Sequence, residues 1–171
     1  MLNNAGESLP LLFKTGGALD LMLGVNPDAD PQRNRAVAGD VRLLVTRVKD
    51  KTTAVLYRPV APAATMSEPV QFASPLRTLR FDRVDNVSDQ VQLAGGAERV
   101  FEFSVPLATL GLQPKSGTTL RGDIGILRGN GFQTRQRVYW SNKATGLVSD
   151  IPSEAELTPQ LWGRFEFRAV P

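Results

Sequence analysis

The chain has 171 residues, 42% hydrophobic and 22% charged, which is enough for one domain with a sizeable core and excludes wholesale disorder. Its 20 basic and 17 acidic residues leave a formal charge of +3, and the basic residues are dispersed, so the charge predicts no nucleic-acid partner. Cysteine and histidine are absent, which excludes disulfides, thiolate zinc sites, cysteine nucleophiles and Ser-His-Asp triads. No apolar run approaches the roughly 18 residues of a membrane span, so we expect no membrane insertion.

The N-terminal part predicts a polar segment followed by a strand. Residues 1–12 are too short and too polar to be a signal peptide, and we expect residues 1–9 to be a flexible segment. The run 18–24 follows a Thr-Gly-Gly turn signal, and its leucines alternate with Asp20 and Met22. This alternation predicts a strand whose leucine face is buried and whose Asp20 and Met22 face is partly wet.

The segment 25–40 is rich in proline, acids and asparagine, and it predicts a loop. Asp28 and Asp30 within it are weak calcium candidates, because closely spaced carboxylates supply the oxygen ligands that calcium prefers. The glycine-spaced, Glu-terminated pattern of a calcium loop is missing, so the pattern favours a solvated turn with Asx hydrogen bonds. We expect no other cofactor.

Short runs with period-two alternation follow at regular intervals. The runs 41–48 and 52–58 flank a Lys-Asp-Lys turn and predict a hairpin. Further strands are predicted over the ranges 76–84, 87–93, 99–105, 120–127, 132–140 and 162–168. One or two short helical turns are expected, at 106–112 and at 153–161, where Ser153 begins a Ser-x-x-Glu capping pattern. Together these elements predict an all-β fold, an antiparallel β-sandwich of immunoglobulin-like or jelly-roll-like type, in a single domain over residues 1–171.

The range 131–162 is the strongest candidate for a binding surface. It holds both tryptophans of the chain, Trp140 and Trp162, and one of its two tyrosines. Trp140 is the candidate ligand platform, and the residues expected to supply contacts at its edge are Tyr139, Asn142, Lys143 and Arg137. The alternative is that the loop 141–161 covers Trp140 and that Trp162 is a plug packed on the core; packing is the favoured reading for Trp162.

Several short motifs occur in a characteristic order. They are the strand Val100 to Val105, Pro106-Leu107-x-x-Leu110-Gly111, the strand 120–127 with Asp123 and Gly125, Tyr139-Trp140, and Leu161-Trp162-Gly163-x-Phe165-x-Phe167. In this order the chain resembles the family 9 carbohydrate-binding modules and their DOMON-like β-sandwich superfamily. The segment 17–24 is similar to the strand that carries the family's early acidic residue. The family has strands before that point, so we expect a fragment or an incomplete sandwich that lacks N-terminal strands.

The resemblance implies a non-catalytic, carbohydrate-binding accessory domain of a larger exported bacterial protein, with an extracellular or periplasmic location. Its partners would be a saccharide and the other domains of a longer chain. The physical basis is that the apolar CH face of a pyranose stacks on an indole while its hydroxyls need polar groups at the ring edge.

Two alternatives stay open at this point. The superfamily includes haem-binding electron-transfer domains, for which Met22 and Lys143 are the remaining axial-ligand candidates in a chain without histidine. The other alternative is a structural or protein-interaction sandwich without a small ligand. An enzyme is not expected. Glycoside hydrolysis needs two carboxyl groups on either side of the scissile bond, and nothing in this sequence indicates which two acidic residues would lie together.

Overall fold

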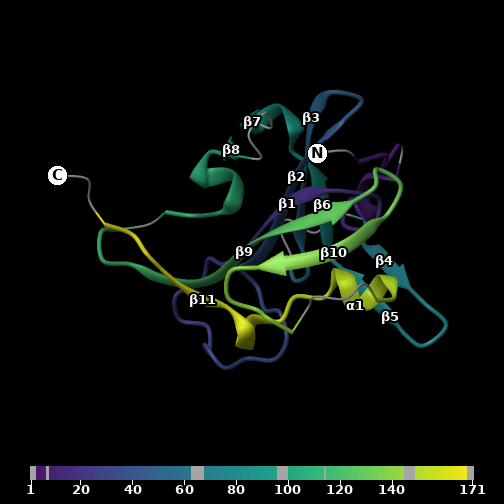
Figure 1. Ribbon diagram of the computed structural model, residues 1–171. Helices are drawn as coiled ribbons and strands as arrows, with labels where there is room; N and C mark the ends of the chain where they lie inside the picture. Colours follow the sequence, from purple (N-terminus) through teal and green to yellow (C-terminus); the bar gives the residue numbers. More distant parts are fainter. Residues whose placement is uncertain are drawn as a thin grey trace.

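The computed structural model describes residues 3–6, 8–62, 68–95, 100–113, 115–144 and 149–168. Strands dominate this part of the chain (Figure 1). The described elements are β1 (Ala18–Gly24), β2 (Asp40–Val48), β3 (Lys51–Arg58), β4 (Val70–Ala73), β5 (Thr78–Phe81), β6 (Arg83–Asn86), β7 (Gln92–Gly95), β8 (Phe101–Ser104), β9 (Thr119–Gly129), β10 (Thr134–Tyr139), α1 (Ile151–Ala155) and β11 (Gly163–Glu166). Short 3-10 turns lie at Leu9–Leu11, Ser88–Gln90, Leu107–Leu110 and Pro159–Leu161. Within the described residues, no helix has the length and apolar character needed to cross a membrane.

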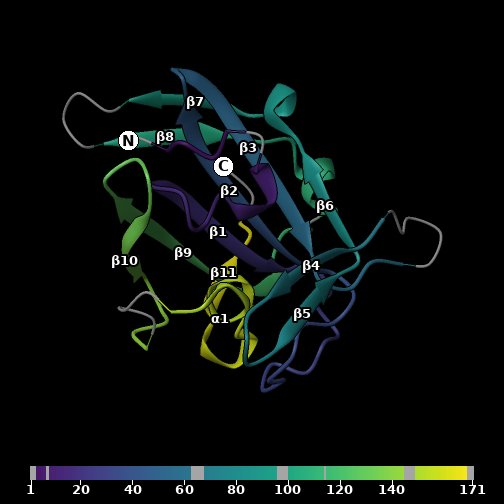
Figure 2. The ribbon, with the colours of Figure 1, turned by 90° about the vertical axis from the view of Figure 1, so that its right-hand side faces the viewer.

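A seven-stranded antiparallel sheet forms the centre of the molecule. Its order is β10-β9-β1-β2-β3-β6, and β11 pairs with the first half of β9 while β10 pairs with the second half. Two small hairpins, β4–β5 and β7–β8, lie on opposite sides of this sheet (Figures 1 and 2). The predicted all-β antiparallel sandwich is therefore confirmed.

One face of the sheet, which we call the inner face, carries Ala18, Asp20 and Met22 of β1 and the residues in register with them. It is covered by the 3-10 turn Leu9–Leu11 with the residues after it, by the β4–β5 hairpin and by α1. An aromatic cluster fills this layer, with ring centroids 5.1 to 6.2 Å apart in edge-on contacts; its members are Phe13, Tyr57, Phe72 and Phe81. Such edge-on pairs are a favourable geometry for aromatic side chains, and the inner face is sealed from solvent.

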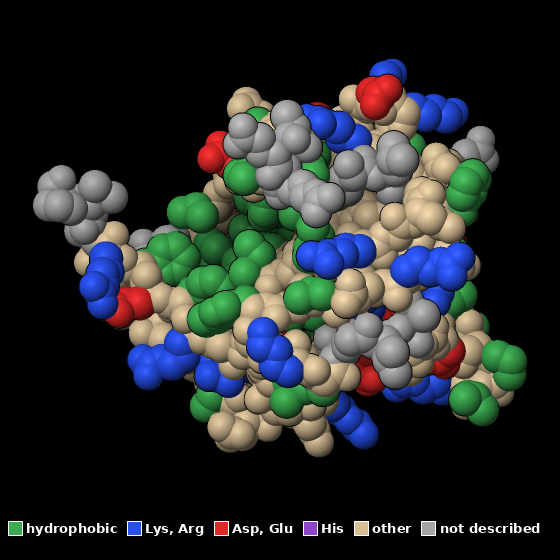
Figure 3. Space-filling model, in the orientation of Figure 1, with side chains coloured by type: hydrophobic (Ala, Val, Ile, Leu, Met, Phe, Trp, Pro, Cys, Tyr) green, Lys and Arg blue, Asp and Glu red, His purple; other side chains and the backbone are tan. Residues whose placement is uncertain are grey.

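The opposite face, which we call the open face, carries Leu19, Leu21 and Leu23 of β1 and the residues in register with them. Its β2 and β3 part is buried beneath the β7–β8 hairpin and the turn Leu107–Leu110. Leu120 at the start of β9 is buried in the same cluster, but the part toward β10 is exposed, and hydrophobic side chains gather in a hollow between β8 and β11 (Figure 3). The exposed large hydrophobic side chains of this part are Ile124 (42%), Val138 (40%) and Trp140 (52%).

The prediction for β1 was right about the strand and wrong about which face is wetter. Asp20 and Met22 are buried, whereas Leu19 and Leu21 are half-buried. The reason is that Asp20 finds a charged partner inside the protein, while the leucine face has only a partial covering layer.

Other local predictions can be compared with the structure directly. The hairpin of β2 and β3 is confirmed, and its turn places Lys49 and Asp50 at positive φ. The predicted strand 76–84 is instead divided at Asp82 between β5 and β6, which belong to different sheets. The helix α1 is capped by Asp150, whose carboxylate accepts from the Ser153 N–H at 3.2 Å, so the predicted cap at Ser153 was wrong. 

The expectation of a flexible segment over residues 1–9 is not met by its described part. The Asn3 side chain is buried and donates to the carbonyl oxygens of Leu12 and Gly17, at 3.1 and 3.3 Å. Asn3 also forms backbone bridges to Gly16 and Gly131. These bonds join the N-terminal residues to the start of β1 and to the turn before β10.

We predict that Phe72→Ala lowers the free energy of unfolding by about 3–5 kcal/mol, because it leaves a cavity in the buried aromatic cluster. Leu76→Ala is the matched control in the same hairpin: Leu76 is 88% exposed, and we expect a change within about 0.5 kcal/mol. Denaturant unfolding of the two variants measures both values. Equal effects would contradict the assignment of β4–β5 as a covering layer.

Candidate functional site

Trp140 lies at the end of β10, on the open face of the sheet. Its backbone N–H donates to the Ile124 carbonyl oxygen at 2.8 Å, which continues the pairing with β9 beyond Tyr139. Because side chains alternate along a strand, Trp140 shares its face with Val138. The Trp140 side chain is 52% exposed, which favours the accessible platform over the alternative of a covered indole.

The indole of Trp140 is held by β11. It packs directly over Gly163, where an added Cβ would collide with the six-membered ring of the indole. It also contacts Phe165 of the same strand, with ring centroids 5.5 Å apart and an interplanar angle of 53°. A ring supported in this way loses little further freedom when a ligand stacks on it, which favours binding.

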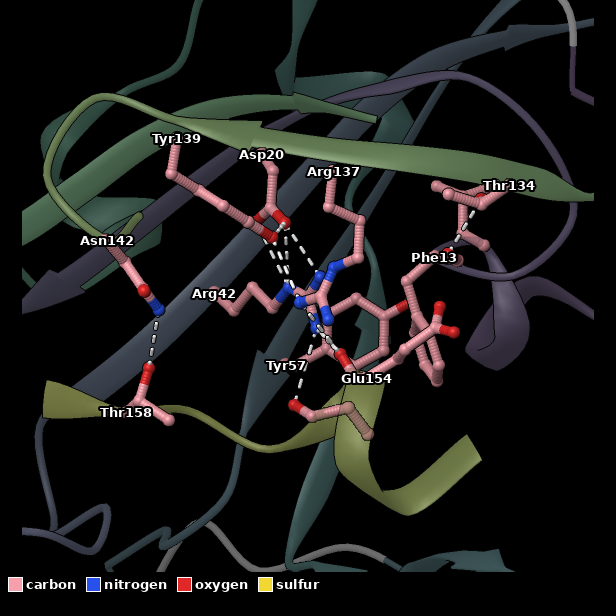
Figure 4. Close-up of polar contacts among 12 residues, drawn as sticks. Phe13, Asp20, Arg42, Tyr57, Thr134, Arg137, Tyr139, Asn142, Glu154 and Thr158 are labelled. Atoms are coloured by element: carbon pink, nitrogen blue, oxygen red, sulfur yellow. Dashed lines mark hydrogen bonds and ion pairs between the residues drawn. The ribbon is translucent and has the colours of Figure 1, made fainter. Parts of the chain in front are cut away.

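Because side chains alternate along β10, Tyr139 and Arg137 lie on the opposite face from Trp140, and Figure 4 shows both beside Asp20 and Arg42. Both side chains are buried, and the Tyr139 hydroxyl donates to Asp20 Oδ2 at 2.5 Å. Arg137 Nη2 donates to the Tyr139 hydroxyl oxygen at 3.1 Å. The structure therefore does not place these two residues at the edge of the Trp140 ring. Arg137 and Tyr139 are two positions apart and share one face of the strand, whereas Trp140, the next residue, points to the other face.

Asn142 is also buried, and its groups make internal hydrogen bonds. Its side-chain amide donates to Thr158 Oγ1 at 3.1 Å, and its backbone N–H donates to Asp123 Oδ2 at 2.7 Å (Figure 4 shows the first bond). The other Asp123 oxygen accepts from the Ser141 N–H at 2.8 Å. Asp123 thus anchors the turn that follows Trp140, and Asn142 supports that turn instead of facing a ligand.

Lys143 is exposed and lies three residues beyond Trp140. Its ammonium donates to the Tyr139 carbonyl oxygen at 2.7 Å. An ammonium group has three N–H donors, so this contact leaves donors for a ligand. Of the five residues predicted for binding, Trp140 and Lys143 are the two whose side chains reach solvent.

A buried ion pair underlies this site. Arg42 donates to Asp20 through Nη2 at 2.7 Å and through Nε at 3.1 and 3.2 Å, and Arg42 Nη1 donates to the Glu154 carbonyl oxygen at 2.7 Å (Figure 4). Burial raises the pKa of Tyr139, and the Asp20 charge raises it further, so the phenol stays protonated and donates to Asp20. This network ties β1, β2, β10 and α1 together beneath the Trp140 strand.

Two further acidic residues, Glu154 and Glu156, lie in or beside α1 and also have structural contacts. Glu154 is buried and pairs with Lys14 at 2.7 Å, and the same carboxylate oxygen accepts from the Ser149 N–H at 2.6 Å. Glu156 pairs with Arg77 at 2.7 Å on the surface. Both acids stabilise the α1 region, and neither lies on the face that carries Trp140.

The calcium candidates lie in the exposed loop between β1 and β2. The Asp28 N–H donates to Asn26 Oδ1 at 3.0 Å, and Asp30 Oδ1 accepts from the Gln32 N–H at 2.8 Å. These are Asx hydrogen bonds, the alternative that the sequence favours. Throughout the described ranges, no group of three or more acidic side chains is placed to hold a metal ion.

Met22, the haem-ligand candidate, is buried in the core of the inner face. An axial ligand needs room for a porphyrin beside its sulfur, and the side chains packed around Met22 occupy that space. The prediction that Met22 lies on a wet face was wrong. Met22 and Lys143 are therefore not supported as a pair of axial haem ligands.

The sequence prediction missed three residues that define the platform: Gly163 beneath the ring, and Ile124 and Val138 beside it. A signal for Val138 was present, because it is two residues before Trp140 on the same predicted strand and therefore shares its face, whereas Ile124 lies on the neighbouring strand β9. Gly163 had no such signal, since the pairing of β11 with β9 is a long-range contact.

Comparison of the chain with protein-family models, with curated proteins and with solved structures finds no match. The resemblance to the family 9 modules consequently rests on short motifs alone. Two of those motifs meet in space, since Trp140 of the Tyr-Trp motif packs on Gly163 and Phe165 of the closing motif.

We predict that Arg42→Met lowers the free energy of unfolding by about 3–5 kcal/mol, because it leaves the Asp20 carboxylate buried without a counter-charge. The control is Arg168→Met, which removes an exposed pair with Glu166 and should cost at most about 1 kcal/mol. Denaturant unfolding at neutral pH compares them. A loss at Arg42 no larger than that at Arg168 would show that the buried network is not the main support.

We predict that Gly163→Ala displaces the Trp140 indole, because the added methyl group occupies the position of the ring. Acrylamide quenching of tryptophan fluorescence should increase relative to the parent protein. The control is Arg164→Ala, at the neighbouring position of β11, whose side chain points to the opposite face of the sheet. Unchanged quenching in Gly163→Ala would contradict the described packing.

Proposed function

We propose that the protein is a non-catalytic carbohydrate-binding domain that stacks a sugar ring on Trp140. The observation that carries this proposal is a supported indole, half exposed, on the uncovered end of a sheet face. The CH face of a pyranose fits such a flat apolar surface. Ile124 and Val138 extend the apolar surface beyond the ring, which suits a chain of sugars or a sugar with a second apolar face.

Polar groups are available at the border of this platform. Lys143 has free ammonium donors close to the end of β10. Gln136 of β10 is exposed, and it points to the same face as Val138 and Trp140 because the three residues are two positions apart along the chain. Amide and ammonium groups at the edge of an aromatic ring suit sugar hydroxyls, which need both donors and acceptors. The arrangement supports weak binding through one open face, as expected for an accessory domain of a larger exported protein.

A second candidate function is protein interaction, and the contiguous apolar side chains of the open face favour it. Exposed apolar patches of this kind mark interaction surfaces in soluble proteins. The two functions need different features: a sugar needs the aromatic ring itself, whereas a protein partner needs the whole apolar area. Ile124→Ser should therefore impair protein association strongly and sugar binding weakly.

We predict that Trp140→Ala abolishes saccharide binding on a glycan array, because the stacking surface is lost. Stacking of this type contributes on the order of 1 kcal/mol or more, enough to remove a weak signal. Phe132→Ala is the matched control, since Phe132 is 76% exposed and lies before β10 rather than on the platform. Trp140→Phe, which retains an aromatic face, should keep part of the binding.

Two outcomes would overturn the proposal: no glycan bound by the parent protein, or equal binding by the parent and by Trp140→Ala. Thermal unfolding of each variant checks that the fold is intact. Trp140→Ala loses the contacts of the indole with Gly163 and Phe165, so we expect a modestly lower melting temperature with an unfolding transition that is still cooperative.

A further inference from the structure

A pocket of about 300 Å³ lies at the other side of the sheet, where β1, β9 and β11 meet the loop between β1 and β2. Its floor includes Gly24, and its charged lining residues are all arginines: Arg33, Arg121 and Arg164. No acidic side chain contributes to the lining. The pocket is therefore electropositive, in a chain whose net charge is only slightly positive.

The strand register explains how these charges meet. Asp40 of β2 is in register with Gly24 of β1, Gly24 with Arg121 of β9, and Arg121 with Arg164 of β11. Residues directly opposite each other in antiparallel strands point to the same face of the sheet. One row across four strands thus carries a carboxylate, a glycine and two adjacent arginines.

Arg33 already neutralises the one carboxylate of this row. It donates to Asp40 Oδ1 through Nη2 at 2.5 Å and to Oδ2 through Nε at 3.0 Å. The Val37 N–H also donates to Oδ2, at 2.9 Å. The Arg33 guanidinium sits above Gly24, which has no side chain to obstruct it, and Asp40 is left with little capacity for a further cation.

Arg121 and Arg164 remain without an acidic partner in the described part of the chain. Arg121 Nε is a buried donor with no acceptor. Two like charges directly opposite in a sheet repel each other, and an unpaired buried donor is unfavourable, so both features need an explanation. An anion placed between the two guanidinium groups would satisfy them together.

We propose that this pocket binds an oxyanion, a sulfate, phosphate or carboxylate group, between Arg121 and Arg164. Guanidinium groups bind such anions through paired, charge-assisted hydrogen bonds. The site is independent of the sugar proposal, because Arg164 and Phe165 are consecutive on β11 and point to opposite faces. The Trp140 platform lies on the Phe165 side, and the anion site lies on the other.

Titration with sodium sulfate at constant ionic strength, balanced with sodium chloride, tests this site in the full chain. Binding is followed by thermal unfolding and by amide chemical shifts in NMR spectra. The variant is Arg164→Gln, and the control is Arg128→Gln, which removes the same charge from an exposed position at the other end of β9. Inorganic phosphate, acetate and digalacturonate, compared with neutral digalactose, then distinguish the possible sources of the oxyanion.

We expect saturable sulfate binding by the parent and by Arg128→Gln, and at least roughly tenfold weaker binding by Arg164→Gln. Arg121→Gln should weaken binding to a similar degree. The shifted amide signals should belong to residues around the pocket. Sulfate also stabilises proteins through exclusion from their surface, and this general effect would raise all melting temperatures equally.

Three outcomes would overturn the proposal. They are a response to sulfate no greater than the response to chloride, equal binding by Arg128→Gln and Arg164→Gln, and shifted signals remote from β9 and β11. The NMR measurement on the parent protein keeps the test decisive if a variant is unstable.

Discussion

The fold depends on one buried ion pair, between Asp20 of β1 and Arg42 of β2. The two residues lie on neighbouring strands, and both are almost fully shielded from water. A buried charge pair is tolerated only when its remaining hydrogen-bonding groups also find partners. Here the Tyr139 hydroxyl and the carbonyl oxygens of Glu154 and Ala155 complete the set, so the charges can be satisfied only when β10 and α1 are docked on the inner face. The pair therefore specifies which face of the central sheet becomes the interior.

The unequal covering of the two sheet faces follows from this arrangement. The inner face is occupied by aromatic rings, α1 and the buried polar network, whereas the layer on the open face covers β2, β3 and the adjoining residues Leu23 and Leu120 but does not reach β10. Apolar residues of β9 and β10 are left in contact with water, with Trp140 as the largest of them. Because side chains alternate, β9 and β11 contribute to the apolar platform on one side and carry Arg121 and Arg164 on the other. One edge of a single sheet thus offers two chemically different surfaces, the first suited to a sugar ring and the second to an oxyanion.

The sequence was most informative where local patterns decide the structure. The strand 18–24, the loop after it and the β2–β3 hairpin were predicted within a residue or two, because turn residues and period-two runs mark them. It was least informative where distant contacts decide. An aspartate alternating with leucines indicates a wet face unless its partner is known, and Arg42 lies a whole loop away from Asp20. The same limit applies to the site: the sequence left open whether Trp140 is exposed or covered, and it placed Tyr139 beside the ring although strand alternation alone could have shown that the two residues face opposite sides. The anion pocket needs the pairing of β9 with β11, and no local pattern announces it.

The central claim is that the two tryptophans of the chain have opposite environments, one in an open platform and one in the core. Fluorine NMR of protein labelled with 5-fluorotryptophan tests this most directly, because it yields one signal for each indole, assigned with Trp140→Phe. A soluble gadolinium chelate should broaden the Trp140 signal strongly and leave the Trp162 signal, from a side chain 2% exposed, nearly unchanged. Protection of both signals would contradict the account, since it would mean that the open face is covered and that Trp140 is not accessible to a ligand.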